Sequence, residues 1–345
     1  MNNIKIVAEI GCNHNGDISL AEALIRAAHE AGADAVKFQT FKSEALVSGL
    51  APKAEYQKKD NAAESQLDML KKLELSPEEY MHLKHYAETL GIEIFSTAFD
   101  MRSIQFLEDI GQKIWKIPSG EITNLPYLEK IRDIKCAGKE IILSTGMSTV
   151  DEIKAAVDIL SGSKDTRFTV LHCNTEYPTA DCDMNLRAIR VLQREFTDWN
   201  VGLSDHSGDT IAAVAAAGMG ITFIEKHFTM DKDLPGPDHK ASITPDELKI
   251  LCTNIRRVEI LLGQEKKFVT SSENKNKYIA RKSIVASRDI KAGEVFTVEN
   301  LTCKRPGNGI SPMKWYEILG RKAEKDFSYD DLITCAGVEW EDKNE

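Results

Sequence analysis

Residues 202–240 decide the fold, with GLSDHS at 202–207, IEKHFT at 224–229 and PGPDHK at 235–240. His206 and His227 each follow a short apolar run, and we expect these runs, Asn200–Leu203 and Ile221–Glu225, to be buried strands. The Ala-rich segment between them, Asp209–Gly218, has the length of a helix. A crossover helix brings the carboxyl ends of consecutive parallel strands side by side, so the segment predicts two imidazoles at one rim of a sheet.

Two histidines at neighbouring strand ends are a common basis for a divalent metal site. Asp205, Asp238 and His239 lie nearby in the sequence, and their presence also favours a metal. The alternative is that one or both histidines are ordinary hydrogen-bonded side chains. Their equivalent positions at two strand ends favour a metal site at His206 and His227.

The strand–loop–helix unit recurs on the amino-terminal side of this segment. Six further buried strands are expected at Ile4–Ile10, Ala35–Gln39, Ile92–Ser96, Ile114–Ile117, Ile141–Ser144 and Phe168–His172. Eight such units in about 260 residues are typical of a (β/α)8 TIM barrel. A doubly wound sheet is the alternative, although it seldom uses eight parallel strands in one run.

Polar residues at the strand ends decide between these two folds. Nearly every expected strand ends in or just before such a residue: Glu9, Lys37, Thr97, Ser119 with Glu121, Ser144, Tyr177, His206 and His227. In a barrel these ends converge on one mouth, where the active site is built, whereas an open sheet would spread them along an edge. The α/β fold is therefore predicted to be a TIM barrel.

The chain divides at about Leu262 into a large and a small part. Residues 1–262 are the predicted barrel, 263–279 a polar linker (beginning GQEKKFVTSSENKNK), and 280–345 a small β-rich domain. Within the barrel, residues 40–75 are too long for a simple connection, and we expect a functional lid or a partly helical insertion there.

Composition excludes several classes of function. The 345 residues carry a net charge of −10 without a compensating basic run, which argues against nucleic-acid and membrane partners. Seven cysteines without a C-x-x-C pair are typical of reduced thiols. The N-terminus, MNNIKIVAEI, lacks a signal-peptide pattern, and we expect a cytoplasmic protein.

Ten motifs occur in an order that resembles a known family: VAEIGCNHNG, KFQTFK, FSTAFD, KIPSGE, LSTGM, LHCNTEYPT, GLSDHS, EKHFT, PGPDH and KRPGNGISP. The chain resembles the bacterial sialic acid synthases and their legionaminic acid relatives over nearly its whole length. The resemblance implies that residues 280–345 are an antifreeze-like (SAF) domain. It also implies condensation of phosphoenolpyruvate with open-chain N-acetylmannosamine and water, which gives N-acetylneuraminate and phosphate.

The resemblance also implies a set of site residues. It assigns Mn²⁺, or another divalent cation such as Mg²⁺ or Co²⁺, to His206 and His227. It assigns phosphoenolpyruvate to Lys37, Thr97, Lys116, Ser119, Ser144 and Ser204, and the amino sugar to Gln39, Glu121, Tyr177, Asp238 and Arg305. Glu9 lies in the matched first-strand motif, and both Glu9 and Glu121 are candidates to activate water. Because Arg305 lies in the small domain, the resemblance implies a domain-swapped homodimer.

Residue chemistry agrees with that distribution. A phosphate and a carboxylate require cations and hydroxyl donors at close range, which Lys37, Lys116 and the Ser/Thr residues supply in an acidic protein. Three alternatives remain open: N,N'-diacetyllegionaminate synthase, which uses 2,4-diacetamido-2,4,6-trideoxymannose; a metal-dependent aldolase that uses pyruvate; and a non-catalytic barrel that binds a sugar or a protein.

Overall fold

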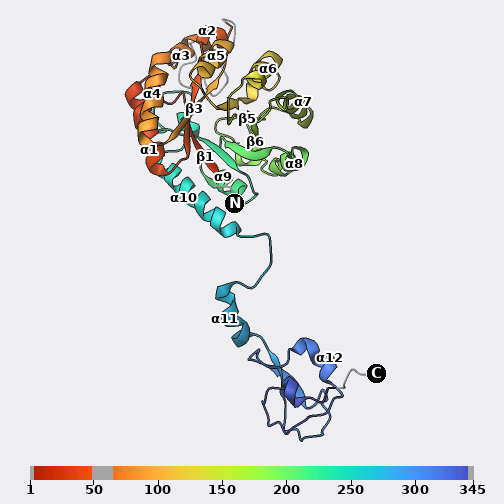
Figure 1. Cartoon of the computed structure of the whole chain (residues 1–345). Coiled ribbons are helices and arrows are strands. Elements are labelled where there is room, and N and C mark those ends of the chain that lie inside the picture. The colour runs from red at the N-terminus through yellow and green to blue at the C-terminus, as the bar shows by residue number, and fades with distance from the viewer. Residues whose placement is uncertain (1–3, 49–64, 341–345) are drawn as a thin grey trace. The chain divides into compact units, whose positions relative to one another are not determined.

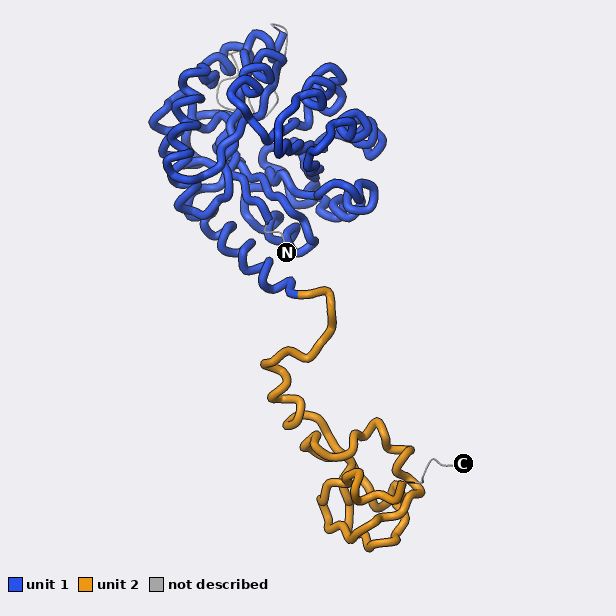
Figure 2. The backbone as a smooth tube through the Cα atoms, in the orientation of Figure 1, with its two compact units in different colours: residues 1–263 blue, residues 264–345 orange. Residues whose placement is uncertain are grey.

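The computed structural model describes residues 4–48 and 65–340. It divides into two compact units, residues 1–263 and 264–345, which are coloured separately in Figure 2. The first unit contains eight parallel strands, as predicted for a TIM barrel. They are β1 (Lys5–Gly11), β2 (Ala35–Thr40), β3 (Glu93–Ala98), β4 (Ile114–Ile117), β5 (Glu140–Ser144), β6 (Arg167–Cys173), β7 (Asn200–Asp205) and β8 (Phe223–His227).

Helices follow the strands and surround them (Figure 1). They are α1 (Ile18–Ala31), α2 (Ser43–Leu46), α3 (Gln66–Lys71), α4 (Pro77–Leu90), α5 (Met101–Asp109), α6 (Leu125–Asp133), α7 (Val150–Leu160), α8 (Ala188–Glu195), α9 (Ile211–Ala217) and α10 (Pro245–Leu262). Several begin where the sequence places a capping box, including Ser76 with Glu79 before α4 and Thr149 with Glu152 before α7. None of the helices in the described ranges combines the length and the apolar character that crossing a membrane requires.

The strands are ordered β3-β2-β1-β8-β7-β6-β5-β4, and β3 and β4 lie next to each other where the barrel closes. At this closure a side chain takes the place of the backbone ladder. Ser96 N donates a hydrogen bond to Gln112 Oε1 over 2.8 Å, and Gln112 Nε2 donates one to Ser96 O over 2.9 Å. Gln112 thus satisfies both backbone hydrogen-bonding groups of Ser96.

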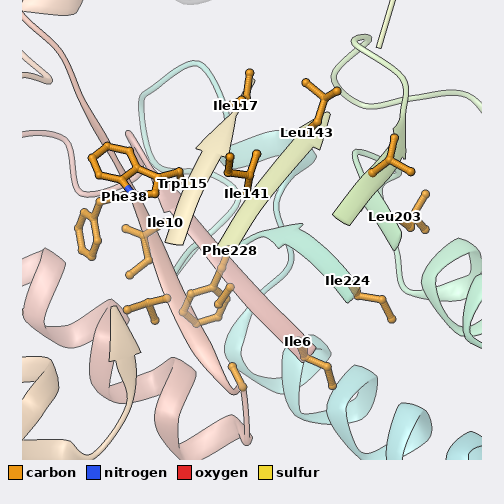
Figure 3. Close-up of a cluster of buried hydrophobic side chains, with 14 of the residues drawn as sticks. Ile6, Ile10, Phe38, Trp115, Ile117, Ile141, Leu143, Leu203, Ile224 and Phe228 are labelled. Carbon is orange, nitrogen blue, oxygen red and sulfur yellow. The ribbon is translucent and has the colours of Figure 1, made fainter. Parts of the chain in front are cut away.

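Alternate residues of each strand point out toward the helices or into the barrel. The outward residues, including Ile6, Ile141, Leu203 and Ile224, belong to the main apolar core (Figure 3). The inward residues nearer the amino-terminal ends of the strands form a second cluster, which we call the lower layer: Val7, Ala35, Phe95, Ile114, Ile142, Leu171 and Phe223. Strand β7 contributes Gly202 here, because a Cβ on it would lie 2.5 Å from Leu171 Cδ2 and 2.6 Å from Phe223 O.

The predicted insertion at residues 40–75 contains α2 and α3 at its two ends, and residues 49–64 lie outside the described ranges. Both histidine-bearing strands end two residues later than predicted: β7 is two residues longer, and β8 has the predicted length but begins and ends two residues later. β7 continues to Asp205, immediately before His206, and β8 includes His227 as its last residue.

The second unit, described by itself, pairs β9 (Ser283–Ala286) with β10 (Leu301–Lys304) in an antiparallel ladder. Isolated bridges such as Ile290 with Phe327 extend this pairing, and a small apolar core includes Phe296 and Ile333. Part of the predicted linker is helical: α11 covers Ser271–Ala280, and a capping box of Thr270 and Glu273 starts it. A short helix, α12 (Trp315–Ile318), follows β10.

Candidate active site

A polar layer lies directly above the lower layer inside the barrel. On every strand, the residue two positions after the lower-layer residue again points inward. These eight residues, all buried, form what we call the upper layer: Glu9, Lys37, Thr97, Lys116, Ser144, Cys173, Ser204 and Glu225. Seven of them line a cavity of about 370 Å³, and the eighth, Thr97, bonds to Lys37.

Two lysines and two carboxylates form the ionic centre of the upper layer. Lys37 Nζ lies 2.8 Å from Glu9 Oε2 and 3.8 Å from Glu225 Oε2, and it donates a hydrogen bond to Thr97 Oγ1 over 3.0 Å. Lys116 Nζ lies 3.3 Å from Glu225 Oε1, which also accepts a 3.0 Å hydrogen bond from Ser204 Oγ. Glu225 therefore connects both lysines.

This environment moves the pKa values of the two carboxyls in opposite directions. Burial raises the pKa of Glu225, but Lys116 and Lys37 outweigh it and hold the pKa at about 2. For Glu9, burial and repulsion from Glu225 outweigh the attraction of Lys37 and raise the pKa to about 7. Two carboxyls whose pKa values differ in this way can supply one base and one acid near neutral pH.

The two predicted histidines lie together at the rim, with ring centroids 5.2 Å apart. His206 Nδ1 donates a hydrogen bond to Asn174 O, and His206 Nε2 lies 3.2 Å from Tyr177 OH and 3.3 Å from Ser204 Oγ. Tyr177 stacks on His206 at a centroid distance of 4.2 Å. Asp238 Oδ2 lies 3.6 Å from His227 Nδ1, which has no hydrogen-bond partner among the described residues.

These side chains fit a divalent cation with open coordination positions. Burial and the proximity of His206 lower the pKa of His227 well below its usual value, so that its ring is neutral and has a lone pair to share. Within residues 4–48 and 65–340, no group of three or more His, Cys, Asp and Glu side chains is arranged around a common point. An ion held at His206 and His227 would therefore take its other ligands from water or substrate.

Hydroxyl donors near Lys116 suit an anion. Ser144 Oγ is buried and has no hydrogen-bond partner within the described ranges. Ser119 Oγ lies nearby and accepts a 2.9 Å hydrogen bond from Gly146 N. An unpaired buried hydroxyl costs about 1–3 kcal/mol, which a bound anion would offset by accepting its hydrogen bond.

Another part of the cavity wall is apolar. It comes from α2, α3 and the ends of β2 and β3, and it consists of Phe41, Leu46, Val47, Met69, Leu70, Leu73 and Phe99. We call this set the apolar wall. The cavity thus combines an ionic floor with a wall that suits apolar groups.

The structure brings together most of the predicted site residues. Eleven line the cavity: Glu9, Lys37, Gln39, Lys116, Ser119, Ser144, Tyr177, Ser204, His206, His227 and Asp238. Glu121 is not among the lining residues, and its Oε2 accepts a 2.6 Å hydrogen bond from Asn124 Nδ2. Arg305 belongs to the second unit, where its exposed side chain donates to Ala280 O over 3.1 Å.

The sequence analysis missed Glu225, the residue that contacts both lysines. It was placed at the end of an apolar strand and given no role. The signal was available, because Phe223, Glu225 and His227 alternate along β8 and must share one face. Cys173, which completes the upper layer on β6, was missed in the same way.

This fold and mouth define a class: (β/α)8-barrel enzymes with a polar, charged cavity at the carboxyl ends of the strands. Residues 24–267 match the model of the NeuB family, and residues 281–339 match that of the SAF domain. The chain belongs to the NeuB family.

Three relatives illustrate the similarity. The chain is 49% identical over 336 residues to the N,N'-diacetyllegionaminic acid synthase of Campylobacter jejuni, covering 96% of this chain and 99% of the relative. It is 46% identical over 342 residues to the Legionella pneumophila protein of the same name, covering 97% and 94%. The N-acetylneuraminic acid synthetase structure from Leptospira borgpetersenii, in complex with citrate, superimposes with a TM-score of 0.70 at 35% identity and covers 80% of this chain and 90% of that one.

Proposed function

We propose that the chain condenses phosphoenolpyruvate with 2,4-diacetamido-2,4,6-trideoxymannose and water to give N,N'-diacetyllegionaminate and phosphate. The sequence analysis ranked N-acetylmannosamine above 2,4-diacetamido-2,4,6-trideoxymannose as the acceptor, whereas the comparisons favour the trideoxy sugar. The observation that carries the acceptor is the 49% and 46% identity to two legionaminic acid synthases over nearly the whole chain. N-acetylneuraminate synthesis is the second candidate, supported by the 35% identical sialic acid synthetase structure.

The apolar wall supports the trideoxy sugar. That acceptor differs from N-acetylmannosamine by a methyl group at C6 and an acetamido group at C4, where the hexose has hydroxyls. Burying a hydroxyl without a hydrogen-bond partner is unfavourable, whereas burying a methyl group against Leu46, Met69 or Leu70 is favourable. A wall of this composition therefore suits the less hydroxylated sugar.

The ionic floor supports phosphoenolpyruvate as the donor. Its phosphate and carboxylate need charge-assisted hydrogen bonds, which Lys37 and Lys116 can donate together with Ser144 and Ser119. The anionic oxygens of the substrate compete with Glu225 for the two lysines. Binding therefore raises the pKa of Glu225 from about 2 toward the range of a useful base.

The reaction forms one C–C bond and one C–O bond from water, and it breaks the C–O bond to phosphate. The methylene carbon of phosphoenolpyruvate attacks the aldehyde carbon, and the enol carbon that bears the phosphate becomes electron-poor. A divalent cation such as Mn²⁺ at His206 and His227, when bound, supplies Lewis-acid charge for the aldehyde oxygen.

Two proton transfers by glutamates precede the loss of phosphate. We assign Glu9 to donate a proton to the former aldehyde oxygen, because its pKa of about 7 lets it hold a proton at neutral pH. Glu225 accepts a proton from the water that adds to the electron-poor carbon. The resulting tetrahedral centre expels phosphate as its new hydroxyl becomes the keto oxygen, and the proton of that hydroxyl leaves with the phosphate. Glu121, also considered for the water, does not line the cavity and has no place in this scheme.

Phosphate release with two acceptors tests the proposal. The purified chain, phosphoenolpyruvate and Mn²⁺ are combined with either 2,4-diacetamido-2,4,6-trideoxymannose or N-acetylmannosamine. We expect at least a tenfold higher kcat/KM for the trideoxy sugar. A preference for N-acetylmannosamine overturns the acceptor, while release with neither sugar, or turnover of pyruvate instead, overturns the reaction.

We further propose that Arg305 completes the sugar site of another subunit in a domain-swapped homodimer, as the family resemblance implies. Mixing His206→Ala with Arg305→Ala under conditions of subunit exchange tests it. Restored activity in proven heterodimers supports a shared site. Inactive heterodimers overturn it.

A further inference from the structure

Lys226 is a fully buried lysine that the chemistry above does not use. It lies on β8 between Glu225 and His227, with a relative exposure of 0%. Since its neighbours face the cavity, its side chain points to the outer side of the sheet, as do those of Ile224 and Phe228, which belong to the core in Figure 3.

On the outer side, the Lys226 ammonium binds the end of the neighbouring strand. Asp205 of β7 is its direct partner in the strand register, and Asp205 Oδ2 lies 3.1 Å from Lys226 Nζ. Lys226 Nζ also donates hydrogen bonds to Ser207 O over 2.6 Å and to Ser207 Oγ over 3.2 Å. Asp205 Oδ1 closes the turn by accepting a 2.8 Å hydrogen bond from Ser207 N.

These contacts link the two histidines through the backbone. Asp205 and Ser207 are the chain neighbours of His206, and Lys226 is the chain neighbour of His227. The Lys226 ammonium therefore holds the residues on both sides of His206 against β8, the strand that bears His227. Sliding or opening of the β7 terminus would break all three contacts at once.

Stability alone does not explain this ion pair. Removing two charges from water costs several kcal/mol each, and well-packed apolar residues of similar volume often stabilise a fold as well or better. Both Lys226 and Asp205 are completely buried, and the neighbouring outward residues of their strands, Ile224 and Leu203, belong to the main apolar core. Apolar replacements would not reproduce the specific geometry of this ion pair.

We propose that Lys226, with Asp205, is a positioning residue that sets the spacing and orientation of His206 and His227. This inference rests on the proposed metal role of the two histidines. Groups that orient metal ligands from outside the coordination shell typically change metal affinity by tenfold to 100-fold when they are lost.

Mn²⁺ binding to the full chain, measured by electron paramagnetic resonance without substrates, tests the proposal. Lys226→Met should weaken binding at least tenfold. The double variant Lys226→Met with Asp205→Leu replaces the pair by apolar groups and should regain stability without regaining Mn²⁺ affinity. If the role of the pair is only structural, stability and Mn²⁺ affinity should recover together in the double variant.

Lys139 provides a matched control. It is also buried, at 2% exposure, but it precedes β5 at the opposite end of the barrel. Its Nζ donates to Ile131 O, Ile134 O and Ser163 Oγ at 2.6, 2.8 and 3.0 Å, near the end of α6. Lys139→Met should lower stability and leave Mn²⁺ affinity unchanged.

The outcomes separate this inference from the proposed function. If the wild type binds Mn²⁺ and His206→Ala abolishes the binding, the metal site stands. Unchanged affinity in both Lys226 variants then overturns the positioning role alone. If the wild type binds no Mn²⁺, the metal role of the histidines falls and the positioning role falls with it.

Discussion

The upper layer of the barrel interior lies two positions after the lower layer on each strand, and both layers come from the same eight strands. Below, Val7, Ile142 and Phe223 pack against one another in a cluster of apolar side chains. Above, Glu9, Ser144 and Glu225 occupy the next inward positions and are equally buried. The lower layer excludes water beneath the charges, which strengthens their interactions and holds their pKa values away from those in solution. The same strands thus carry an apolar layer that stabilises the fold and, two residues further along, a polar layer that lines the cavity.

The largest expected effect is a loss of stability from the lower layer. Phe223→Ala should lower the free energy of unfolding by about 3–5 kcal/mol, because it deletes a buried ring and leaves a cavity. Denaturant unfolding measures this loss. The KM for phosphoenolpyruvate should be unchanged below the unfolding transition, and a change in KM without a loss of stability contradicts the division of roles.

A pH-dependent effect is expected from the upper layer. The pKa of Glu9 is raised by burial from 4.5 to about 7, so the protonated form favours folding. Its contribution is full below pH 4.5 and is lost as the pH rises through 7. Glu9→Gln cannot lose a proton, and its stability relative to wild type should therefore rise by about 3 kcal/mol between pH 4.5 and pH 8. Parallel stability curves for the two proteins would refute the raised pKa.

A smaller effect is expected on substrate binding. Lys116→Met removes a charge-assisted hydrogen bond worth about 1.5–3 kcal/mol, which corresponds to an increase of about tenfold to 150-fold in the KM for phosphoenolpyruvate. Burial already lowers the pKa of Lys116, and Lys37 remains near Glu225, so stability should not fall. An increase confined to the KM of the sugar would mean that the anion binds elsewhere.

The sequence was sufficient to predict the barrel, because polar residues recur at strand ends in a pattern that only a closed sheet gathers at one mouth. It was also sufficient to pair His206 with His227. Glu225 and Lys226 were harder to place, since charges inside a short apolar run look like interruptions until the strand register shows which face each occupies. Reading β8 as alternating would have placed Glu225 beside His227.

The remaining differences have local causes. The helix α11 within the predicted linker starts at a Thr-x-x-Glu capping box, Thr270 to Glu273, the same kind of signal that begins α7. Glu121 was expected in the site from its position after a strand and from the family resemblance, but after the 3-10 turn Ser119–Glu121 its carboxylate accepts a hydrogen bond from Asn124. Strand-end position alone does not specify where a side chain points after the strand has ended.

The most direct test uses two adjacent inward positions of β5. Ile142 is in the lower layer, and Ser144 is in the upper layer with a buried hydroxyl that lacks a partner among the described residues. Ile142→Ala should lower the free energy of unfolding by about 2–5 kcal/mol and leave kcat/KM unchanged. Ser144→Ala should leave stability unchanged or raised and lower kcat/KM for phosphoenolpyruvate about tenfold or more. If both substitutions change stability and kcat/KM in parallel, the two layers do not have separate roles.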